Sequence, residues 1–451
     1  MRYYRTRSYI IIAGILLLTA CAPGRYADRT TVTDKIRQQS GYSAAPQQSA
    51  GRVQFPPGVQ TADGISEDEA VQIALWNNAQ FQTDLADMLL ANADVTNAGI
   101  IQNPLLRYLS PNAGILASGY INFAIDFIWQ RPARIKAAKL NADRVKDSLV
   151  QKGFTLIRDV QLAYTELLLA AERLEITREN ADTRAAINRL ASARLRNGDI
   201  SELEATTSRA DSASAADDLL RAKLALTNAR NQLNYSMGIT PADTMLVLQK
   251  QHADTLLKPV NKTDYLSLAI AFRPDIRAAQ TAIIAAGKTL GWERSRIISF
   301  TATLNYQYIK TATEKGSNWL PNTANPGFQA EIPIFNRNQG NIQKAKAGIE
   351  KAMLQYHAVV QKALLEVLQA YYLYEQSYQS YLLWNSNALL PLEDAVQLVK
   401  QTYQRGDISY LPVLEAIRQL QNGKLRKAEV TAQLRRAISQ LNYSIGQKHQ
   451  Q

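Results

Sequence analysis

Cysteine, histidine, methionine, proline and glycine are all scarce in this chain of 451 residues. It contains one cysteine, three histidines, five methionines, 15 prolines and 21 glycines. A single cysteine excludes a disulfide within the chain. The low glycine and proline content argues against a loop-rich fold and favours long helices.

Motifs for chemistry are missing as well. The three histidines (His252, His357 and His449) are scattered, and none has metal-ligand spacing with another histidine, the cysteine or an acid pair. No phosphate-binding glycine loop and no G-x-S-x-G nucleophile motif occurs. The sequence therefore predicts a protein that is not an enzyme, that needs no cofactor and that has no metal site of its own.

The positive charge is not concentrated in one segment. The formal net charge is +12 at pH 7, which is typical of many nucleic-acid-binding proteins. However, three of these charges (Arg2, Arg5 and Arg7) lie at the extreme N-terminus, and the other basic residues alternate with acidic ones and glutamine along helical stretches. Because there is no basic block and no aromatic platform, we expect no nucleic-acid partner.

The N-terminus has the pattern of a secretion signal. The stretch "MRYYRTRSYIIIAGILLLTAC" combines a basic start with an apolar run that is shorter than the roughly 20 residues of a membrane-spanning helix. Its end, Leu18-Thr19-Ala20-Cys21, resembles the bacterial lipobox, in which the cysteine is lipidated. We expect residues 1–20 to be a lipoprotein signal peptide and Cys21 to carry lipid. The alternative is an ordinary cleaved signal with a chance cysteine.

The next segment, residues 21–64, is rich in Ser, Gln, Pro, Gly and Thr and has no helical periodicity. This composition predicts a lipidated N-terminal tether or an extended arm.

Two short sequence motifs each occur twice in the chain, with the same spacing in residues between their copies. "GDIS" occurs at Gly198–Ser201 and Gly406–Ser409, and "QLNYS" followed by Met or Ile and Gly ends at Gly238 and at Gly446, each pair being 208 residues apart. Further matches upstream are 207 and 195 residues apart. The change in offset places an insertion, predicted to be a long loop, at Thr313–Gly327. We predict two tandem repeats, 65–240 and 263–446, with a linker at 241–262 and a tail at 447–451.

Each repeat shows the same order of periodicities. Helical spacing at about Glu67–Ala98 and Asp264–Arg296 is followed by strands with period two. Long helices then run from Pro132 to about Arg196 and from Gln339 to about Arg405. At each "GDIS", glycine supplies the positive φ that ends a helix, and Ser or Asp offers a cap to the next one. The predicted fold is mainly α with a small β part, each repeat having one strand pair and one hairpin of long antiparallel helices.

The strands alternate between an apolar and a polar face. In "FTATLNYQY", for example, Phe300 and Leu304 share one face while Thr303 and Asn305 share the other. This pattern suits a soluble sheet on a core, and it also suits strands with lipid on one side and water on the other. Four strands per chain cannot close a membrane barrel, because the smallest have about eight, so chains would have to pool strands.

The order of a signal, a lipobox and then, twice, a helix, a strand pair and a long helical hairpin resembles the TolC-type outer-membrane efflux channels. The resemblance rests on the motifs "RLRNGDISELEA" (Arg194–Ala205), "YQRGDISYLPVLEA" (Tyr403–Ala416) and "RPDIRAA" (Arg273–Ala279). "IPIFNRNQGNIQKA" (Ile332–Ala345) is similar to the heavy-metal branch, the outer-membrane partners of cobalt–zinc–cadmium and copper pumps. The resemblance covers nearly everything after residue 65.

The resemblance implies a homotrimer in the outer membrane. Three chains would form a twelve-stranded transmembrane β-barrel that continues into a twelve-helix periplasmic tunnel, anchored by lipid at Cys21. The implied partners are outer-membrane lipid, a periplasmic adaptor and an inner-membrane pump of the RND type. The implied function is a passive efflux duct, with heavy-metal cations as the expected cargo. The alternatives are a multidrug or type I secretion duct of the same family, or a lipid-anchored coiled-coil scaffold without a pore.

The resemblance also implies site residues. The periplasmic tip that contacts the adaptor would comprise Gly198, Asp199, Ser201, Gly406, Asp407 and Ser409. The gate candidates are Glu204, Glu415 and Tyr403. Pro412 stands where some relatives carry an acid. A proline is allowed at this position, in the first turn of a helix, if Ser409 caps that helix. Alternatively, the two glutamates only stabilise helix N-termini, by about 0.3–1 kcal/mol each.

Asp126 and Glu331 are the candidates for the barrel lumen, because the period of two places both on polar strand faces. The alternative for this pair is ordinary surface alternation.

Overall fold

The computed structural model describes residues 26–44, 53–59, 64–110, 115–239, 261–313, 316–319, 323–386 and 388–448. The predicted signal peptide, Cys21 and nearly all of the predicted linker lie outside these residues. The chain divides into two compact units, one made of 1–31, 85–148 and 275–359 and the other of 32–84, 149–274 and 360–451. Among the described helices, none has the length and apolar character needed to cross a bilayer.

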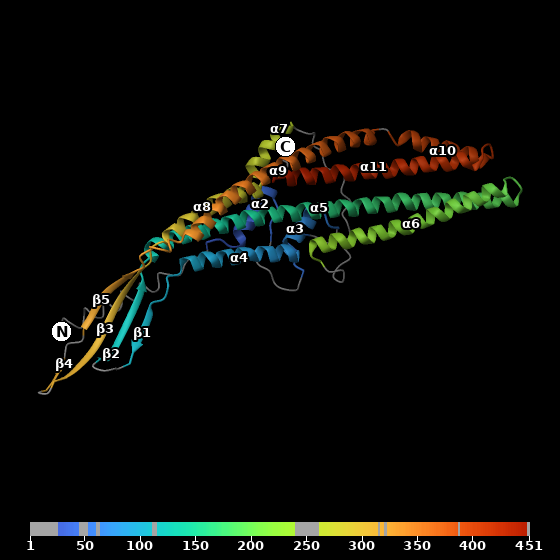
Figure 1. Cartoon of the computed structure of the whole chain (residues 1–451). Helices are drawn as coiled ribbons and strands as arrows, with labels where there is room; N and C mark the ends of the chain where they lie inside the picture. Colours follow the sequence, from blue (N-terminus) through green and yellow to red (C-terminus); the bar gives the residue numbers. More distant parts are fainter. Residues whose placement is uncertain are drawn as a thin grey trace. The chain divides into compact units, whose positions relative to one another are not determined.

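The first unit contains the sheet, formed by β1 (Leu105–Leu109), β2 (Ile115–Ala124), β3 (Phe300–Thr313), β4 (Gly316–Trp319) and β5 (Thr323–Ala330) (Figure 1). All neighbours are antiparallel, and β3 pairs with β2 as well as with β4 and β5. The insertion predicted as a loop therefore contains strands. The sequence "GSNW" has no apolar alternation that would predict a strand, and β4 is paired with the end of β3.

The register separates the sheet into an apolar and a polar face. Residues directly opposite each other in antiparallel strands share a face. One apolar row is formed across the sheet by Leu106, Ile121, Leu304 and Pro326, and the next by Phe123, Ala302 and Phe328. The apolar face is open to solvent in the single chain, since Leu106 is 70% exposed and Phe328 is 76% exposed.

Long helices follow the strands. They are α5 (Phe127–Arg196), α6 (Glu202–Met237), α9 (Gln339–Ser386), α10 (Leu390–Arg405) and α11 (Tyr410–Ile445). In Figure 1, α5 with α6, and α10 with α11, form the two predicted hairpins. The second predicted helix is interrupted between α9 and α10, where Pro391 fits the first turn of a new helix but not a helix interior. The adjoining Leu389 and Leu392 pack against Gly423 of α11, where a Cβ would lie 2.8 Å from Leu392 Cδ1.

The two helices predicted ahead of the strands are each broken once. α3 (Glu67–Asn77) gives way to α4 (Ala79–Gly99) at Asn78, and α7 (Lys262–Phe272) gives way to α8 (Pro274–Ser295) at Arg273. Asn78 and Arg273 both have extended backbone, with ψ of 114° and 124°. Arg273 precedes a proline, which disfavours helical backbone at that position.

The same joint is built at both breaks. Gly238, which caps α6, packs on the backbone of Asn77, and Gly446, which caps α11, packs on the backbone of Arg273. Both glycines have positive φ, of 73° and 74°. The breaks lie 195 residues apart and the glycines 208 apart. The repeated "QLNYS" motifs therefore end α6 and α11 at equivalent positions, each against the break of one helix.

The arm after the predicted signal peptide is not wholly extended. It contains α2 (Arg29–Ser40), which the composition did not predict. Val32 and Ile36 are one helical turn apart and fully buried, and Ile36 lies over Gly153 of α5. Tertiary packing of this one face therefore holds the helix.

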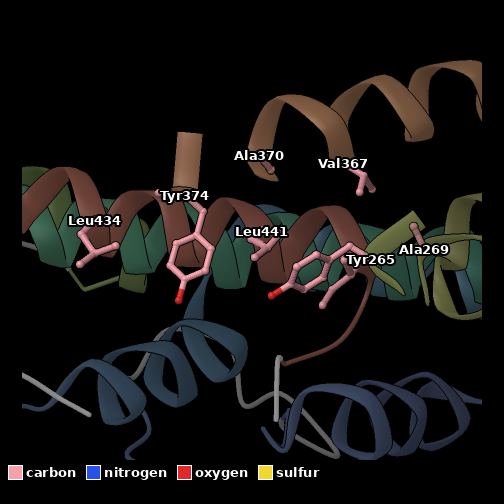
Figure 2. Close-up of a cluster of buried hydrophobic side chains, with 9 residues drawn as sticks. Tyr265, Ala269, Val367, Ala370, Tyr374, Leu434 and Leu441 are labelled. Carbon is pink, nitrogen blue, oxygen red and sulfur yellow. The ribbon is translucent and has the colours of Figure 1, made fainter. Parts of the chain in front are cut away.

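The core of the second unit lies between its helices. One cluster joins α7, α9 and α11 through nine buried residues: Tyr265, Ala269, Val367, Ala370, Tyr374, Leu434, Ala437, Leu441 and Ile445 (Figure 2). A second cluster, near the turns, comprises Ile187, Val396, Tyr403, Tyr410, Val413, Leu414 and Ile417. This second cluster supports the candidate site.

Candidate functional site at the two helical turns

The first turn has the predicted caps. Gly198 adopts a positive φ of 78° after the end of α5, and the Asp199 amide donates to the Arg194 carbonyl oxygen at 2.9 Å. The Ser201 hydroxyl accepts a hydrogen bond from the Glu204 amide at 3.2 Å. The glycine stop and the serine cap are therefore both confirmed here.

The second turn keeps the glycine but loses the serine cap. Gly406 has a φ of 90°, and its amide donates to the carbonyl oxygens of Thr402 and Tyr403. Ser409 occupies the N-cap position of α11, but its side chain makes no capping hydrogen bond. The predicted cap is wrong because the third residue of the helix is Pro412, which has no N–H for a serine to bind.

Glu204 links the two turns. Its Oε1 accepts a hydrogen bond from the Tyr410 amide, at the start of α11, at 2.8 Å. A carboxylate at a helix N-terminus is stabilised by the unpaired amides there and by the helix dipole. Glu204 of the first hairpin therefore supplies the N-terminal partner that Ser409 does not provide to the second.

Tyr403 is buried beside this link. It is 1% exposed, and its ring centroid lies 5.1 Å from the Arg194 guanidinium carbon and 6.2 Å from the Tyr410 ring centroid. Its hydroxyl has no hydrogen-bond partner within the described chain. Burial, and then the charge of Glu204, raise the pKa of Tyr403, while Arg194 acts in the opposite direction. Tyr403 therefore joins Glu204 at the interface of the hairpins.

A second link, which sequence reasoning missed, lies at Asp211 of α6. Its carboxylate accepts from the Tyr410 hydroxyl at 3.1 Å and lies 3.7 Å from Arg184 Nη1 and 3.6 Å from Arg418 Nη2. Burial, followed by the charge of Asp211 and the hydrogen bond to it, raises the pKa of Tyr410 to about 12. The available signal was the seven-residue spacing from Glu204 to Asp211, which places both on one helix face.

The remaining predicted tip residues do not join this cluster. Glu415 is exposed and accepts a hydrogen bond from Gln419 of its own helix at 2.9 Å, so the structure does not bring it to Glu204. The side chains of Asp199, Asp407, Ser201 and Ser409 are exposed at the turns. A gating role for Glu204, Tyr403 and Glu415 stays a prediction.

The two lumen candidates lie just outside the strands of the first unit. Asp126 stands in the turn between β2 and α5 and accepts from Gln130 Nε2 at 3.0 Å, so its prediction on a strand face needs correction. Glu331 follows β5 directly and accepts from the Ser299 hydroxyl at 3.1 Å. Its amide also donates to the Ser299 carbonyl oxygen, so Glu331 continues the polar face beyond the strand.

Metal ligands do not gather in the described part of the chain. A search of those residues finds no group of three or more His, Cys, Asp or Glu side chains that could hold an ion. The turns instead offer a set of hydrogen bonds and ion pairs that join two helical hairpins.

Comparison with known proteins places this architecture in a family. The family model described as "Outer membrane efflux protein" matches residues 117–239 and 265–447, well over half of the chain. The cobalt-zinc-cadmium resistance protein CzcC of Cupriavidus metallidurans is 25% identical over 409 residues, covering 89% of this chain and 95% of the relative. The cation efflux system protein CusC of Escherichia coli is 26% identical over 309 residues, covering 66% of this chain and 65% of the relative.

Solved structures share the fold. A crystal structure of CusC aligns with a TM-score of 0.70 at 21% identity, covering 89% of this chain and 98% of that one. The outer-membrane channel OprN aligns with a TM-score of 0.71 at 16% identity, covering 90% and 98%. The resemblance to TolC-type channels is confirmed, and the chain belongs to the outer membrane efflux protein family.

Proposed function

We propose that this chain is the outer-membrane channel of a tripartite efflux system that exports metal cations. The observation that carries the proposal is the likeness to a cobalt-zinc-cadmium resistance protein over 89% of the chain. A protein named for cation efflux is a second relative. The chain would act as a passive duct, receiving cations from an inner-membrane pump of the RND type through a periplasmic adaptor.

The exposed sheet supports a pooled barrel. The apolar face of the sheet is open to solvent in the described part of the chain, and β1 and β5 each leave one edge unpaired among the described strands. In lipid, unpaired backbone groups cost several kcal/mol each, so such a sheet must close on itself. β4 and β5 pair with the same side of β3, so the sheet is four strands wide. Three chains would give twelve strands.

The duplicated element order supports a tunnel. Each half runs through a broken helix, paired strands and a long helical hairpin. We assign these halves to tandem repeats, 65–240 and 263–446, joined by the linker 241–262. If α9 and α10 count as one interrupted helix, three chains supply twelve helices for a periplasmic tunnel. Cys21 would carry the lipid that anchors each chain in the outer membrane.

The turns are the proposed end of the tunnel. The exposed Gly198, Asp199, Ser201, Gly406, Asp407 and Ser409 would face the adaptor. Glu204 and Tyr403, which hold the two hairpins together, would have to separate when the tunnel widens. Glu415 is exposed in the single chain and would contribute its charge to the surroundings of the opening.

Conductance in planar lipid bilayers tests the duct itself. Purified full-length protein, with the mass of three chains by light scattering, should give discrete current steps. A lipid-anchored scaffold has no pore, so folded trimer that leaves the bilayer silent would contradict the proposal. The trimer mass is checked first, because a monomer would already contradict the pooled barrel.

A further inference from the structure

Arg107 is the one charged residue among the strand residues whose side chains the structure describes. It lies in the middle of β1, is exposed, and makes no ion pair or hydrogen bond within the described chain. The register places it opposite Tyr120 of β2, which lies opposite Asn305 of β3, which lies opposite Asn325 of β5. The arginine therefore stands in a row of neutral polar residues.

This row belongs to the polar face of the sheet. The row nearer the helices contains Leu105, Asn122 and Thr303, and the row on the other side contains Leu109, Ser118 and Gln307, so the polar residues of this face lie mainly on β2 and β3. The residues on either side of Arg107 in β1, Leu106 and Tyr108, share the opposite face with the apolar row of Leu304. In a barrel with lipid outside, the guanidinium would consequently face the water-filled lumen, where a charge is tolerated.

The position along the strand is central. Tyr120 lies four residues from the end of β2 at Ala124, so the row is about 14 Å from the helix side of the sheet at about 3.4 Å per residue. That is near half the height of an apolar band of about 25 Å. Three copies would place three guanidinium groups at one level of the lumen.

The two acids at the helix end of the sheet, Asp126 and Glu331, are too far away to neutralise these charges. Asp126 lies six residues from Tyr120 along the chain. Glu331 is bonded to Ser299, which is six residues from Asn305 along β3. Six residues of strand span about 20 Å, whereas charges in 0.1 M salt are screened over about 10 Å. The two levels would therefore act on passing ions separately.

We propose that Arg107 forms a ring of three positive charges that makes the middle of the barrel lumen favour anions over cations. The proposal rests on the proposed trimeric duct and names a residue that sets its ion preference. Rings of charged side chains select ions of opposite sign in other channels. Because the ring is a fixed charge in a passive duct, it would slow the passage of cations in both directions, and net outward export would depend on the pump.

The test is the reversal potential in planar bilayers across a potassium chloride gradient. Arg107→Gln should raise the potassium-to-chloride permeability ratio about fourfold, as expected for three screened charges about 10 Å from the pore axis. Arg107→Lys should leave the ratio unchanged. Arg37→Gln, which removes an exposed charge from α2, is the matched control and should also leave it unchanged.

A cysteine variant covers the case in which Arg107→Gln does not assemble. Arg107→Cys can be modified with positive, neutral or negative thiol reagents on the same folded trimer, because the native Cys21 is the lipid-carrying residue in the proposal. The ratio should rise in that order. An equal ratio in all forms, with current steps present, would overturn the ring alone. A wild-type protein without current steps would refute the duct and the ring together.

Discussion

A single proline, Pro412, changes which hydrogen bond caps the helix after the second turn. Both turns carry the word "GDIS", yet Ser201 caps its helix and Ser409 does not. Pro412 removes the amide that Ser409 would bind, and Glu204 bonds the Tyr410 amide instead. A local cap is thereby replaced by a bond between hairpins. This exchange couples the start of α11 to the first half of the chain.

Two glycines on either side of α6 should respond differently to alanine. Gly198 and Gly238 have similar positive φ values of 78° and 73°, so each Gly→Ala change should cost about 1–2 kcal/mol for the left-handed backbone. An added Cβ at Gly198 meets no atom within 4 Å, whereas at Gly238 it would lie 2.3 Å from the Asn77 carbonyl oxygen. Gly238→Ala should therefore cost more, about 3–4 kcal/mol, in the free energy of unfolding.

Circular dichroism during denaturant unfolding of the two variants measures this difference. Equal midpoints for Gly198→Ala and Gly238→Ala would contradict the close packing of Gly238 against the break between α3 and α4.

The Tyr410–Asp211 contact should be sensitive to alkali. The pKa of Tyr410 is raised to about 12 from an ordinary value of 10.0. Because the folded value is the higher one, the contact contributes its full stability below about pH 10 and loses it as the pH rises through 12. Phenolate absorbance should show late-titrating tyrosines, and Tyr410→Phe should reduce their number by one per chain. Tyr26, Tyr164 and Tyr374 should remain, since each pKa is also raised to about 12.

An unchanged amplitude between pH 11 and 12 in Tyr410→Phe would show that Tyr410 is not protected by Asp211.

At the scale of elements, the two helix starts form a matched pair for mutagenesis. Ser201→Ala should destabilise the protein by about 1 kcal/mol, because it removes a side-chain cap. Ser409→Ala should cost close to nothing, because no such bond exists there. In a Pro412→Ala background, the restored amide gives Ser409 a partner, so Ser409→Ala should then cost about 1 kcal/mol. Denaturant midpoints of the four variants provide the comparison.

Equal costs for Ser409→Ala with and without Pro412 would mean that the proline is not the reason for the missing cap.

The elements show where sequence reasoning succeeds and where it fails. The long helices, the strand faces and both glycine stops follow from periodicity and from backbone preferences that are local to the chain. The break at Asn78 was missed because it is built by close packing against Gly238, 160 residues away in sequence. The break at Arg273 also packs on a distant glycine, Gly446, but Pro274 was a local signal for it that the periodicity reading passed over. β4 and α2 were missed for a related reason, since strand pairing and burial hold them.

The candidate site was predictable only in part. Glu204 and Tyr403 were named from motif positions, and the structure brings them together. Glu415 was named on the same grounds, but its carboxylate accepts a hydrogen bond from Gln419 of its own helix. The Asp211 contacts with Tyr410, Arg184 and Arg418 join three helices, and no spacing within one segment specifies such an arrangement.

At the scale of the whole molecule, the two faces of the sheet should tolerate charge differently. Leu304 lies on the apolar face and its neighbour Thr303 on the polar face. An arginine facing lipid costs about 2–4 kcal/mol near the bilayer midplane, whereas a lumen position carries no such cost. Leu304→Arg should therefore lower the amount of trimer in isolated outer membranes, and Thr303→Arg should leave it near the wild-type level. The reverse order would show that the apolar face does not meet lipid.

The central claim is that the chain exports metal cations, and the metal content of cells tests it most directly. A strain lacking this protein would be exposed to sublethal zinc, cobalt, nickel or copper, and its cell-associated metal measured alongside its retention of dyes and drugs. We expect raised metal with unchanged dye and drug retention, restored to normal by the wild-type gene. Unchanged metal, with raised retention of dyes or drugs, would contradict a metal duct and identify a duct for organic compounds.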